Sequence, residues 1–255
     1  MKISIITPTY NSAKTLQDTL ESISQQSHQN LEHLIINGLS KDDTLKIARE
    51  YQEKFPYIKI ISEKDSGIYE AMNKGISLAS GDIITILNSD DFYIDNEVLA
   101  KVSRIFEERE EIQAVYGDLI YVKRKDVNKN IRHWISGEYQ EEKLNWGWTI
   151  PHPTFFLRSE IYKKNKYNTS LALASDYELI LRLLKIDKIK TYYLPQVLVK
   201  MRAGGSSGKD IFNRIRGWRE LKESWKINSL VIPRFFILRR LFCKVNQFFK
   251  TIKIY

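Results

Sequence analysis

Two adjacent aspartates follow an aliphatic run in the segment IITILNSDDFY, which spans Ile83 to Tyr93. The run from Ile83 to Leu87 is typical of a strand that is covered on both faces of a parallel sheet. Asp90 and Asp91 come directly after it, so their carboxylates repel each other and lose hydration where the strand meets its loop. A divalent metal that carries a phosphate-bearing ligand would offset both effects. The structural alternative is a solvated turn in which Asp90 caps the next element.

The first hundred residues alternate between predicted strands and predicted helices. The expected strands are 3–10, 31–37, 58–63 and 83–87, and the expected helices are 12–26, 41–55 and 67–79. This alternation predicts right-handed crossovers and a mostly parallel sheet, in which ligands bind outside the carboxyl ends of the strands. The chain at those ends reads TPTY, NGLSKDD, EKDSG and NSDD. All four segments are polar and turn-forming, which predicts a ligand site at this edge of the sheet.

The pattern is looser beyond residue 100. Helices are expected at 99–110 and 175–186 and strands at 114–124 and 190–202, whereas 124–150 is expected to be irregular. AGGSSGKD at 203–210 predicts a flexible loop that could close over a site. That segment lacks the first glycine and the final Ser or Thr of a phosphate loop, and no GxGxxG follows the first strand. Both nucleotide motifs are therefore excluded.

The composition indicates a globular protein with a basic tail. The chain has 255 residues, 43% hydrophobic content and a formal net charge of +9, which suits one large α/β domain or two small ones. The 30 residues from Lys226 onward carry seven basic and no acidic side chains, so the body is nearly neutral. Nucleic acid is accordingly not an expected partner. The single cysteine excludes an intramolecular disulfide, and the four histidines are too scattered for a zinc site.

The basic tail also predicts where the protein resides. Met1 leads straight into a strand, and no apolar stretch reaches the roughly 20 residues of a membrane span, so a cytoplasmic protein is expected. A helix over 234–250 would be amphipathic and would lie on an anionic membrane surface. Its apolar arc would hold Phe235, Leu238, Leu241, Phe242, Val245, Phe248 and Phe249, and the other side Arg239, Arg240, Lys244, Gln247 and Lys250. The alternative is that the apolar arc packs on the protein body or on a second subunit, as in a homodimer.

Several segments together carry a resemblance to a known family. ISIITPTYNSAKTLQDTLESISQQS, NGLSKDDT, DSGIYEAMNKGISLASGD and LNSDD, in this order and spacing, resemble a family 2 glycosyltransferase of the GT-A type. SDYELILRL resembles the start of that family's catalytic helix. The resemblance covers residues 1–205. It implies an α/β fold with a nucleotide-sugar-binding half at 1–100 and an acceptor-binding half at 101–205. The charge and hydrophobic pattern of the tail adds a flexible loop with basic amphipathic helices at 206–255.

The resemblance also implies a metal and nucleotide site. Asp91 matches the ligand of the divalent metal, Mn²⁺ or Mg²⁺, and Asp90 matches a position near the ribose and the metal. With Ser89 they form SDD, a variant of the family's Asp-x-Asp motif that lacks the leading Asp and leaves the number of ligands open.

Further nucleotide-binding positions are implied upstream. Pro8, Thr9 and Tyr10 match the strand end that holds the nucleoside, and Asp65 matches a position close to the nucleotide. Asn37 stands where the family has an Asp that accepts the N3–H of uracil. Its carbonyl could accept the same proton while its amide donates to O4, which favours uracil or thymine over guanine. An ordinary turn residue is the alternative for Asn37.

Catalytic and acceptor residues follow from the same resemblance. Asp176 matches the general base that removes the acceptor hydroxyl proton in an inverting transfer; the alternative is a carboxylate that favours the helix dipole. Glu178 is a weaker candidate for this base. Trp146 and Trp148 could stack on a sugar ring, and His152 could reach a phosphate or the metal. The alternative is that these aromatic residues fill the core.

The reaction implied is the metal-assisted, inverting transfer of a hexose or N-acetylhexosamine from a UDP-sugar. The acceptor would be an oligosaccharide or a saccharide linked to polyprenyl diphosphate, in bacterial surface polysaccharide (O-antigen, capsule or exopolysaccharide) synthesis at the inner face of the cell membrane. No QxxRW signature is present, which argues against a processive synthase. Two alternatives are a non-catalytic nucleotide-sugar-binding module, which would not need Asp176, and a phosphatase with Asp90 or Asp91 as nucleophile, which would place its Asp after the first strand.

Overall fold

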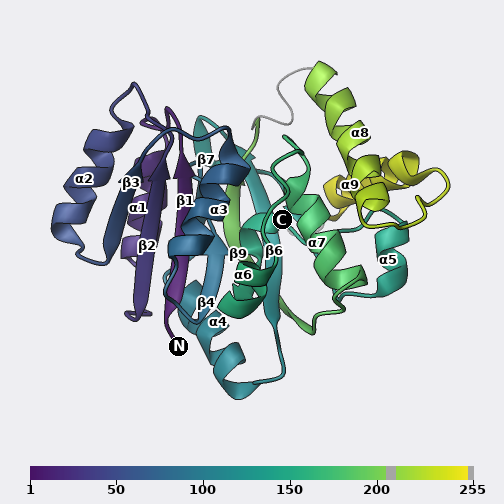
Figure 1. The fold of residues 1–255 in the computed structure, drawn as a ribbon, viewed down its shortest axis with the longest axis horizontal. Helices are drawn as coiled ribbons and strands as arrows, with labels where there is room; N and C mark the ends of the chain where they lie inside the picture. Colours follow the sequence, from purple (N-terminus) through teal and green to yellow (C-terminus); the bar gives the residue numbers. More distant parts are fainter. Residues whose placement is uncertain (205–210, 252–255) are drawn as a thin grey trace.

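The computed structural model describes residues 1–204 and 211–251, and one sheet runs through the first of these ranges (Figure 1). Its strands are β1 Ile3–Thr9, β2 Leu31–Asn37, β3 Ile58–Ser62, β4 Ile83–Ile86, β5 Asp91–Tyr93, β6 Ala114–Lys123, β7 Asp126–Trp134, β8 Phe156–Arg158 and β9 Thr191–Arg202. The strand order is β3-β2-β1-β4-β8-β6-β9-β5, and β7 pairs with β6 outside this path.

Helices cover the sheet and form the C-terminal region. They are α1 Leu16–Ser24, α2 Thr44–Lys54, α3 Ile68–Leu78, α4 Val98–Glu108, α5 Glu141–Asn145, α6 Ser159–Lys164, α7 Ser175–Lys185, α8 Ile211–Ile227 and α9 Phe236–Thr251. A turn of 3-10 helix, η1, spans His152–Thr154. For residues 244–251 only the course of the helix is described.

The first four strands are parallel, as the alternation of strand and helix predicts. β1 pairs in parallel with β2 and β4, and β2 pairs in parallel with β3. The second half of the sheet is mixed, because β8 runs antiparallel to β4 and β6 while β6 and β9 are parallel. The fold is a mixed α/β sheet flanked by helices.

Buried side chains pack on both faces of this sheet. Every residue of β1 is buried, and its side chains alternate between the faces. Ile6 lies in a core with residues of α3 and α7, whereas Ile3 and Ile5 lie in a core with residues of α4. In Figure 1, α3, α6 and α7 cover the face of the sheet that is turned toward the viewer. Burial on both faces is why β1, β2 and β4 are marked by aliphatic runs in the sequence.

The segment 124–150 is not irregular, contrary to expectation. β7 forms a hairpin with β6, in which Leu119 lies opposite Trp134. Its side chains are all half-buried or exposed, so no aliphatic alternation marks the strand in the sequence. The same segment contains α5, which buries Leu144 beneath it. Long-range pairing with β6 decides this structure, and local pattern does not reveal it.

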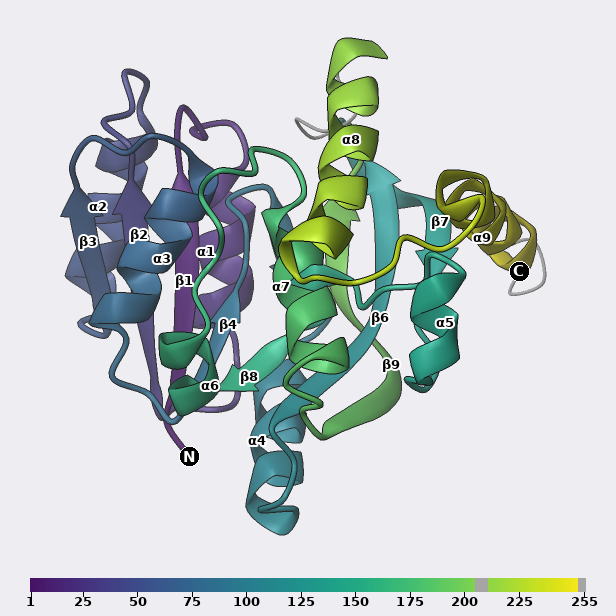
Figure 2. The ribbon, with the colours of Figure 1, turned by 45° about the vertical axis from the view of Figure 1, so that its right-hand side comes forward.

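The C-terminal helices are anchored on α7. Trp225 and Phe236 are buried with their rings 5.6 Å apart, and the Trp225 indole N–H donates a hydrogen bond of 2.9 Å to the Tyr177 hydroxyl. Figure 2 shows α8 beside α7 and α9 beside β7 and α5. Residues 205–210, which contain most of the expected loop, lie outside the described residues. Within the described part of the chain, no helix is long and apolar enough to cross a membrane.

Candidate active site

The two adjacent aspartates lie at the start of β5, between the carboxyl end of β4 and the strand β9. Asp91 is fully buried. Its Oδ2 accepts a hydrogen bond of 3.2 Å from the Asn88 amide, while its Oδ1 has no partner among the described residues. Burial raises the pKa of the Asp91 carboxyl well above its usual range, and the neighbouring Asp90 carboxylate raises it further. A buried carboxylate with an unpartnered oxygen is unfavourable unless a cation or donor completes it.

These residues fit a divalent metal only with help from other ligands. The described residues include no group of three or more His, Cys, Asp or Glu side chains arranged to hold an ion. Asp90 and Asp91 could therefore supply carboxylate oxygens, and the remaining ligands would come from a phosphate-bearing substrate or from water. This arrangement agrees with the missing leading Asp of the motif.

Two arginines hold the Asp90–Asp91 loop, and the sequence patterns singled out neither. Arg202, at the end of β9, is buried and donates a hydrogen bond of 2.8 Å to the Asp90 carbonyl. It also forms an ion pair with Asp18 of α1. Arg124, in the turn between β6 and β7, lies 3.2 Å from the Asp90 carboxylate. The loop is thus held by residues that are more than 30 positions away in the chain.

Loops from the carboxyl ends of β1, β2 and β4 meet beside the aspartates. Ser12 and Ser89 share a hydrogen bond of 2.8 Å between their hydroxyls. The Asn11 backbone N–H donates to the Ser40 hydroxyl at 2.9 Å. Tyr10, which was predicted to contact the base, has 63% of its side chain exposed at this edge. The predicted convergence of strand ends is therefore present in the structure.

Asn37 does not present its side chain to a ligand as predicted. The residue is buried, its amide donates to the Ser62 hydroxyl at 2.7 Å, and its carbonyl accepts from the Ser40 hydroxyl at 2.6 Å. Thr9 is also buried, at 3.4 Å from the same carbonyl. Both polar ends of the Asn37 amide are used within the protein, so its predicted contact with uracil N3–H is not supported by this geometry.

Asp65, another residue predicted to lie close to the nucleotide, is beside Gly38 at the end of β2. A Cβ on Gly38, the residue after β2, would come within 2.6 Å of the Asp65 Oδ2, so a larger residue there would displace the Asp65 carboxylate. Burial raises the pKa of the Asp65 carboxyl, and its other oxygen accepts from the Gly67 N–H at 3.1 Å. Pro8, in β1, is buried and pairs with Ile36 of β2. It shapes the strand end and offers no side-chain donor or acceptor.

Asp176 lies in the first turn of α7 and is held by residues of α3 and α7. Its Oδ1 accepts hydrogen bonds from the Tyr69 hydroxyl at 3.2 Å and from the Tyr177 N–H at 2.8 Å. No described residue donates to Oδ2. Tyr69, on α3, is buried and belongs to the DSGIYEAMNKG segment, so the same helix that follows Asp65 also orients Asp176.

An aromatic cluster surrounds the Asp176 carboxylate. His152 shares a hydrogen bond of 2.6 Å with the Tyr167 hydroxyl, which in turn lies 2.9 Å from the Tyr162 hydroxyl. Tyr69 stacks on Tyr167 with ring centroids 5.6 Å apart. Burial lowers the pKa of His152, and the Asp176 carboxylate partly opposes this shift. His152 is therefore a neutral, buried neighbour of Asp176.

The predicted second base, Glu178, is a structural residue. It is almost fully buried and pairs with Arg182 one turn further along α7, with a distance of 2.9 Å between Oε1 and Nε. The Asn228 amide also donates to Oε1 at 3.0 Å. Arg182 neutralises the charge of Glu178 and Asn228 occupies one of its oxygens, so Asp176 remains the candidate base.

A cavity of about 620 Å³ opens beside Asp176. Strands β6 and β7 and helices α7, α8 and α9 contribute to its wall, in residues that include Tyr121, Arg132, Trp134, His152, Asp176, Met201, Arg214, Trp218, Arg240 and Leu241. Met201 pairs with Asp91 in the β5–β9 ladder, so the cavity adjoins the acidic loop. This arrangement places the Asp176 carboxylate and the acidic Asp90–Asp91 loop beside the same cavity.

The two tryptophans predicted to stack on the acceptor do not line this cavity. Trp148 packs against Tyr116 and Tyr139 in the core, and its indole N–H donates to the Ser136 carbonyl at 2.6 Å. Trp146 is 55% exposed and lies under the Arg239 guanidinium, at 4.5 Å from its ring centroid. Trp134 and Trp218 line the cavity in their place.

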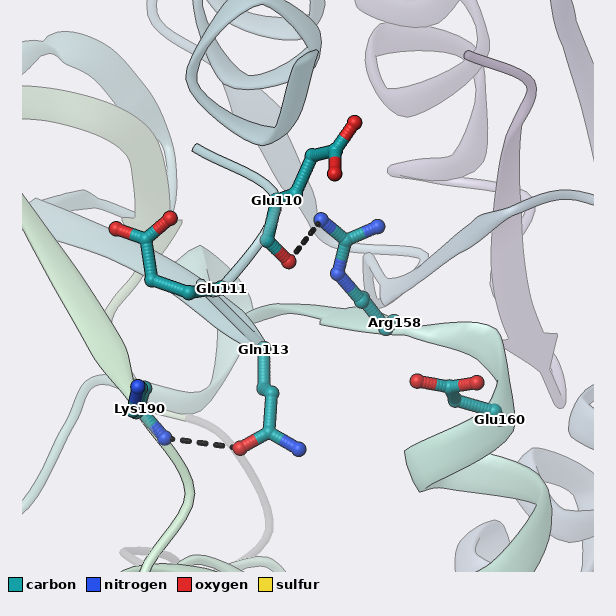
Figure 3. Close-up of a pocket in the computed structure, with 6 residues that line it drawn as sticks. All are labelled: Glu110, Glu111, Gln113, Arg158, Glu160 and Lys190. Atoms are coloured by element: carbon teal, nitrogen blue, oxygen red, sulfur yellow. Dashed lines mark hydrogen bonds between the residues drawn. The ribbon is translucent and has the colours of Figure 1, made fainter. Parts of the chain in front are cut away.

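A second depression lies at the amino ends of β6 and β9, and none of the predicted site residues lines it (Figure 3). Its wall consists of Glu110, Glu111, Gln113, Arg158, Glu160 and Lys190. The Arg158 guanidinium already donates to the carbonyls of Phe106, Glu110 and Ile112. Ligands of parallel sheets bind at the opposite, carboxyl edge. The candidate site is therefore the acidic loop with the cavity at Asp176.

Sequence comparisons identify the family of the chain. Residues 4–165 match the family described as Glycosyl transferase family 2. The chain is 30% identical over 213 residues to a PGL/p-HBAD biosynthesis glycosyltransferase of Mycobacterium bovis, an alignment that covers 83% of this chain and 80% of that one. It is 26% identical over 209 residues to an uncharacterized glycosyltransferase of Rickettsia typhi, with coverage of 78% and 63%.

Solved structures share the fold. S. aureus TarS in complex with UDP-GlcNAc is 18% identical, with a TM-score of 0.70 over 100% of this chain and 76% of that chain. Mannosyltransferase PcManGT from Pyrobaculum calidifontis, in complex with GDP-Man and Mn²⁺, is 18% identical, with a TM-score of 0.66 and coverage of 94% and 69%. At these identities the likeness concerns the fold, which is of the GT-A type.

Proposed function

The chain belongs to glycosyl transferase family 2, and on that basis we propose that it transfers a hexose or N-acetylhexosamine, with inversion, from a UDP-sugar to a lipid-linked or oligosaccharide acceptor. The chain is a glycosyltransferase by its family and by the similar proteins. One observation carries the finer proposal: the buried Asp91 carboxylate, with its unpartnered oxygen, adjoins a cavity whose wall contains Asp176.

The donor would bind across the loops at the carboxyl ends of β1, β2 and β3. Tyr10 is exposed there, and Asp65 sits against the backbone of Gly38. The Asp65 carboxylate is a better candidate than Asn37 to accept an N–H of the base, since the Asn37 amide is used internally. A UDP-sugar is proposed because TarS, which shares the fold, binds UDP-GlcNAc. PcManGT binds GDP-Man, so the fold alone does not select the base.

Asp90 and Asp91 would hold a divalent cation, Mn²⁺ or Mg²⁺, whose charge would stabilise the diphosphate as it leaves. Arg202 keeps the backbone of Asp90 in place through its bond to the carbonyl. Asp176 would take the proton of the acceptor hydroxyl on Oδ2, because Tyr69 and the Tyr177 N–H both occupy Oδ1. The two bonds orient the carboxylate toward the acceptor before the proton moves.

Neither alternative from the sequence is favoured by the site. A phosphatase would need an Asp nucleophile after the first strand, and β1 is followed by Tyr10, Asn11 and Ser12. A binding module would not need an oriented carboxylate at Asp176. Transfer is therefore the function that uses all of these residues.

A panel of nucleotide sugars tests the proposed function. We expect the protein to release UDP from one UDP-sugar in the presence of Mn²⁺ and a saccharide acceptor linked to polyprenyl diphosphate. Released nucleotide and glycosylated product would be measured together, so that hydrolysis is distinguished from transfer. Failure with every UDP-sugar while a GDP-sugar reacts would contradict the assignment of the donor.

A lipid-linked acceptor requires the protein to meet a membrane, and we propose that the C-terminal helices provide this contact. Phe235, Leu238 and Phe242 expose 71%, 63% and 67% of their side chains. Phe212, on α8, is 79% exposed, and Arg214 beside it is exposed too. Two arginines of the predicted basic side do not point away from the protein. The Arg239 guanidinium lies over the ring of Trp146, and the Arg240 guanidinium lies over the ring of Tyr177.

The membrane contact is tested with liposomes. We expect the full chain to sediment with anionic vesicles at low salt, and Leu238→Glu with Phe242→Glu to reduce the bound fraction about tenfold or more, because both exposed side chains would insert at the interface. Leu78→Glu, an exposed apolar position on α3, serves as the matched control. Equal sedimentation of the double variant, or no sedimentation of the wild type, would show that this face does not bind membrane.

A further inference from the structure

The C-terminal helix forms part of the wall of the catalytic cavity. Ile237, Arg240 and Leu241 of α9 line the cavity together with Asp176. The helix is seated closely, since a Cβ on Gly147 would come within 2.7 Å of the Arg240 Cα. Gly147 also has a φ of +82°, which favours glycine at this position. Residues of α9 therefore form part of the site itself, and the helix is not merely attached to the surface of the protein.

Arg240 brings a cationic group with an unused donor to this wall. Its guanidinium lies 4.9 Å from the ring centroid of Tyr177, the residue after Asp176. Its Nη1 donates to the Gly147 carbonyl at 2.8 Å. Its Nε is buried and has no partner among the described residues. The guanidinium carries a fixed positive charge and has five N–H donors, of which the bond to the Gly147 carbonyl uses a single donor, so a ligand oxygen in the cavity is a suitable complement.

The charge of the cavity wall favours an anion. Arg132 and Arg214 line the same cavity as Arg240, and the Arg132 guanidinium lies 3.9 Å from the ring centroid of Tyr121. Among the described residues of the wall, Asp176 is the one carboxylate facing these three arginines. Phosphate oxygens suit an arginine fork because they accept two parallel N–H bonds.

We infer that Arg240 binds a phosphate group of a substrate in the cavity, so that the C-terminal helix completes the active site. The inference rests on the proposed function, in which two substrates carry phosphate. One source is the diphosphate of the donor, because the cavity adjoins the Asp91 loop. The other is the phosphate of a lipid-linked acceptor, because Trp218 and Leu241 give the same wall an apolar part. The chemistry of recognition is the same for both.

Arg240→Gln and its matched control Arg239→Gln separate these sources. Both residues lie on α9 with their guanidinium groups over aromatic rings, but Arg239 lies over Trp146, outside the cavity. Binding of UDP with Mn²⁺, and of farnesyl diphosphate as a prenyl diphosphate probe, would be measured by titration calorimetry on the full chain. We expect Arg240→Gln to weaken one of the two probes by about tenfold or more, the loss of one charge-assisted pair, and Arg239→Gln to leave both unchanged.

The outcomes assign or overturn the inference. Weaker UDP binding with unchanged uridine binding identifies the donor diphosphate, and weaker binding of farnesyl diphosphate alone identifies the acceptor side. Unchanged binding of both probes to a folded Arg240→Gln variant overturns the inference. Arg240→Lys keeps the positive charge and the aliphatic stem but lacks the guanidinium fork, so this variant should fold and lose less affinity. If Arg240→Gln does not fold and Arg240→Lys binds both probes with wild-type affinity, the inference is also overturned. If the wild type binds neither probe, the proposed function fails instead.

Discussion

Asp176→Asn lowers the rate of sugar transfer by at least about 10²-fold, the contribution expected of a general base. The substitution keeps the shape of the side chain and its bonds from Tyr69 and the Tyr177 N–H, but it removes the basic oxygen that would receive the acceptor proton. Because the acidic loop that would hold the donor is separate from this helix, the affinity for UDP should stay within about twofold. Initial rates of transfer and calorimetric titration with UDP measure the two quantities.

Asp187→Asn is the matched control for this prediction. Asp187 is an exposed carboxylate just beyond the end of α7, so its loss of charge is similar but far from the cavity. A further readout is the rate at raised pH, where hydroxide in solution partly replaces a missing base and should narrow the difference from the wild type. A variant at position 176 with the wild-type rate would mean that Asp176 serves only to begin the helix.

Asp91→Ala abolishes release of UDP, and so does an excess of chelator on the wild type. This prediction rests on the buried Asp91 carboxylate, whose Oδ1 has no partner among the described residues. The loss should reach about 10³-fold or more, since charge on a leaving diphosphate is stabilised by several kcal/mol when a cation is held beside it. Activity measured before and after dialysis against chelator, followed by addition of Mn²⁺ or Mg²⁺, checks the dependence.

A readout other than activity separates metal binding from misfolding. We expect Mn²⁺ with UDP to raise the melting temperature of the wild type and of Asp95→Asn, an exposed aspartate of the same loop region. The Asp91→Ala variant should fold but show no such rise, because a ligand of the ion is missing. Full activity of the wild type in excess chelator would remove the metal from the proposal.

Much of the nucleotide half could be predicted from the sequence. The boundaries of β2 agree with the predicted strand, and those of β1 and β3 agree to within one residue. The aliphatic runs Ile3–Ile6 and Ile83–Ile86 mark strands that are buried on both faces, which is a local consequence of composition. Because parallel strands bring their carboxyl ends to one edge, polar residues placed after each strand had to converge. The helix expected over 175–186 is also present, as α7, and the family resemblance had placed Asp176 at its start.

The acceptor half could be predicted less well, for physical reasons that act over long range. β7 is a half-exposed strand that depends on pairing with β6, so no period of two marks it. Trp146 and Trp148 were predicted to stack on a sugar ring, with packing in the core as the alternative, because residue type alone does not distinguish a core aromatic from one in a cavity wall; Trp148 packs in the core. Asn37 was predicted to face the base, yet Ser40 and Ser62 take up its amide.

The residue types and their spacing by themselves determined the alternating α/β half, the acidic loop at Asp91 and the carboxylate that begins α7. Those features depend on local periodicity within each segment and on the alternation of strands and helices along the chain, which brings the carboxyl ends of parallel strands to one edge. Only the tertiary structure decided that Tyr69 orients Asp176, that Arg202 holds the Asp90 loop, and that α9 turns Arg240 into the cavity. Such contacts join residues up to 112 positions apart, and no local pattern encodes which partner each side chain meets.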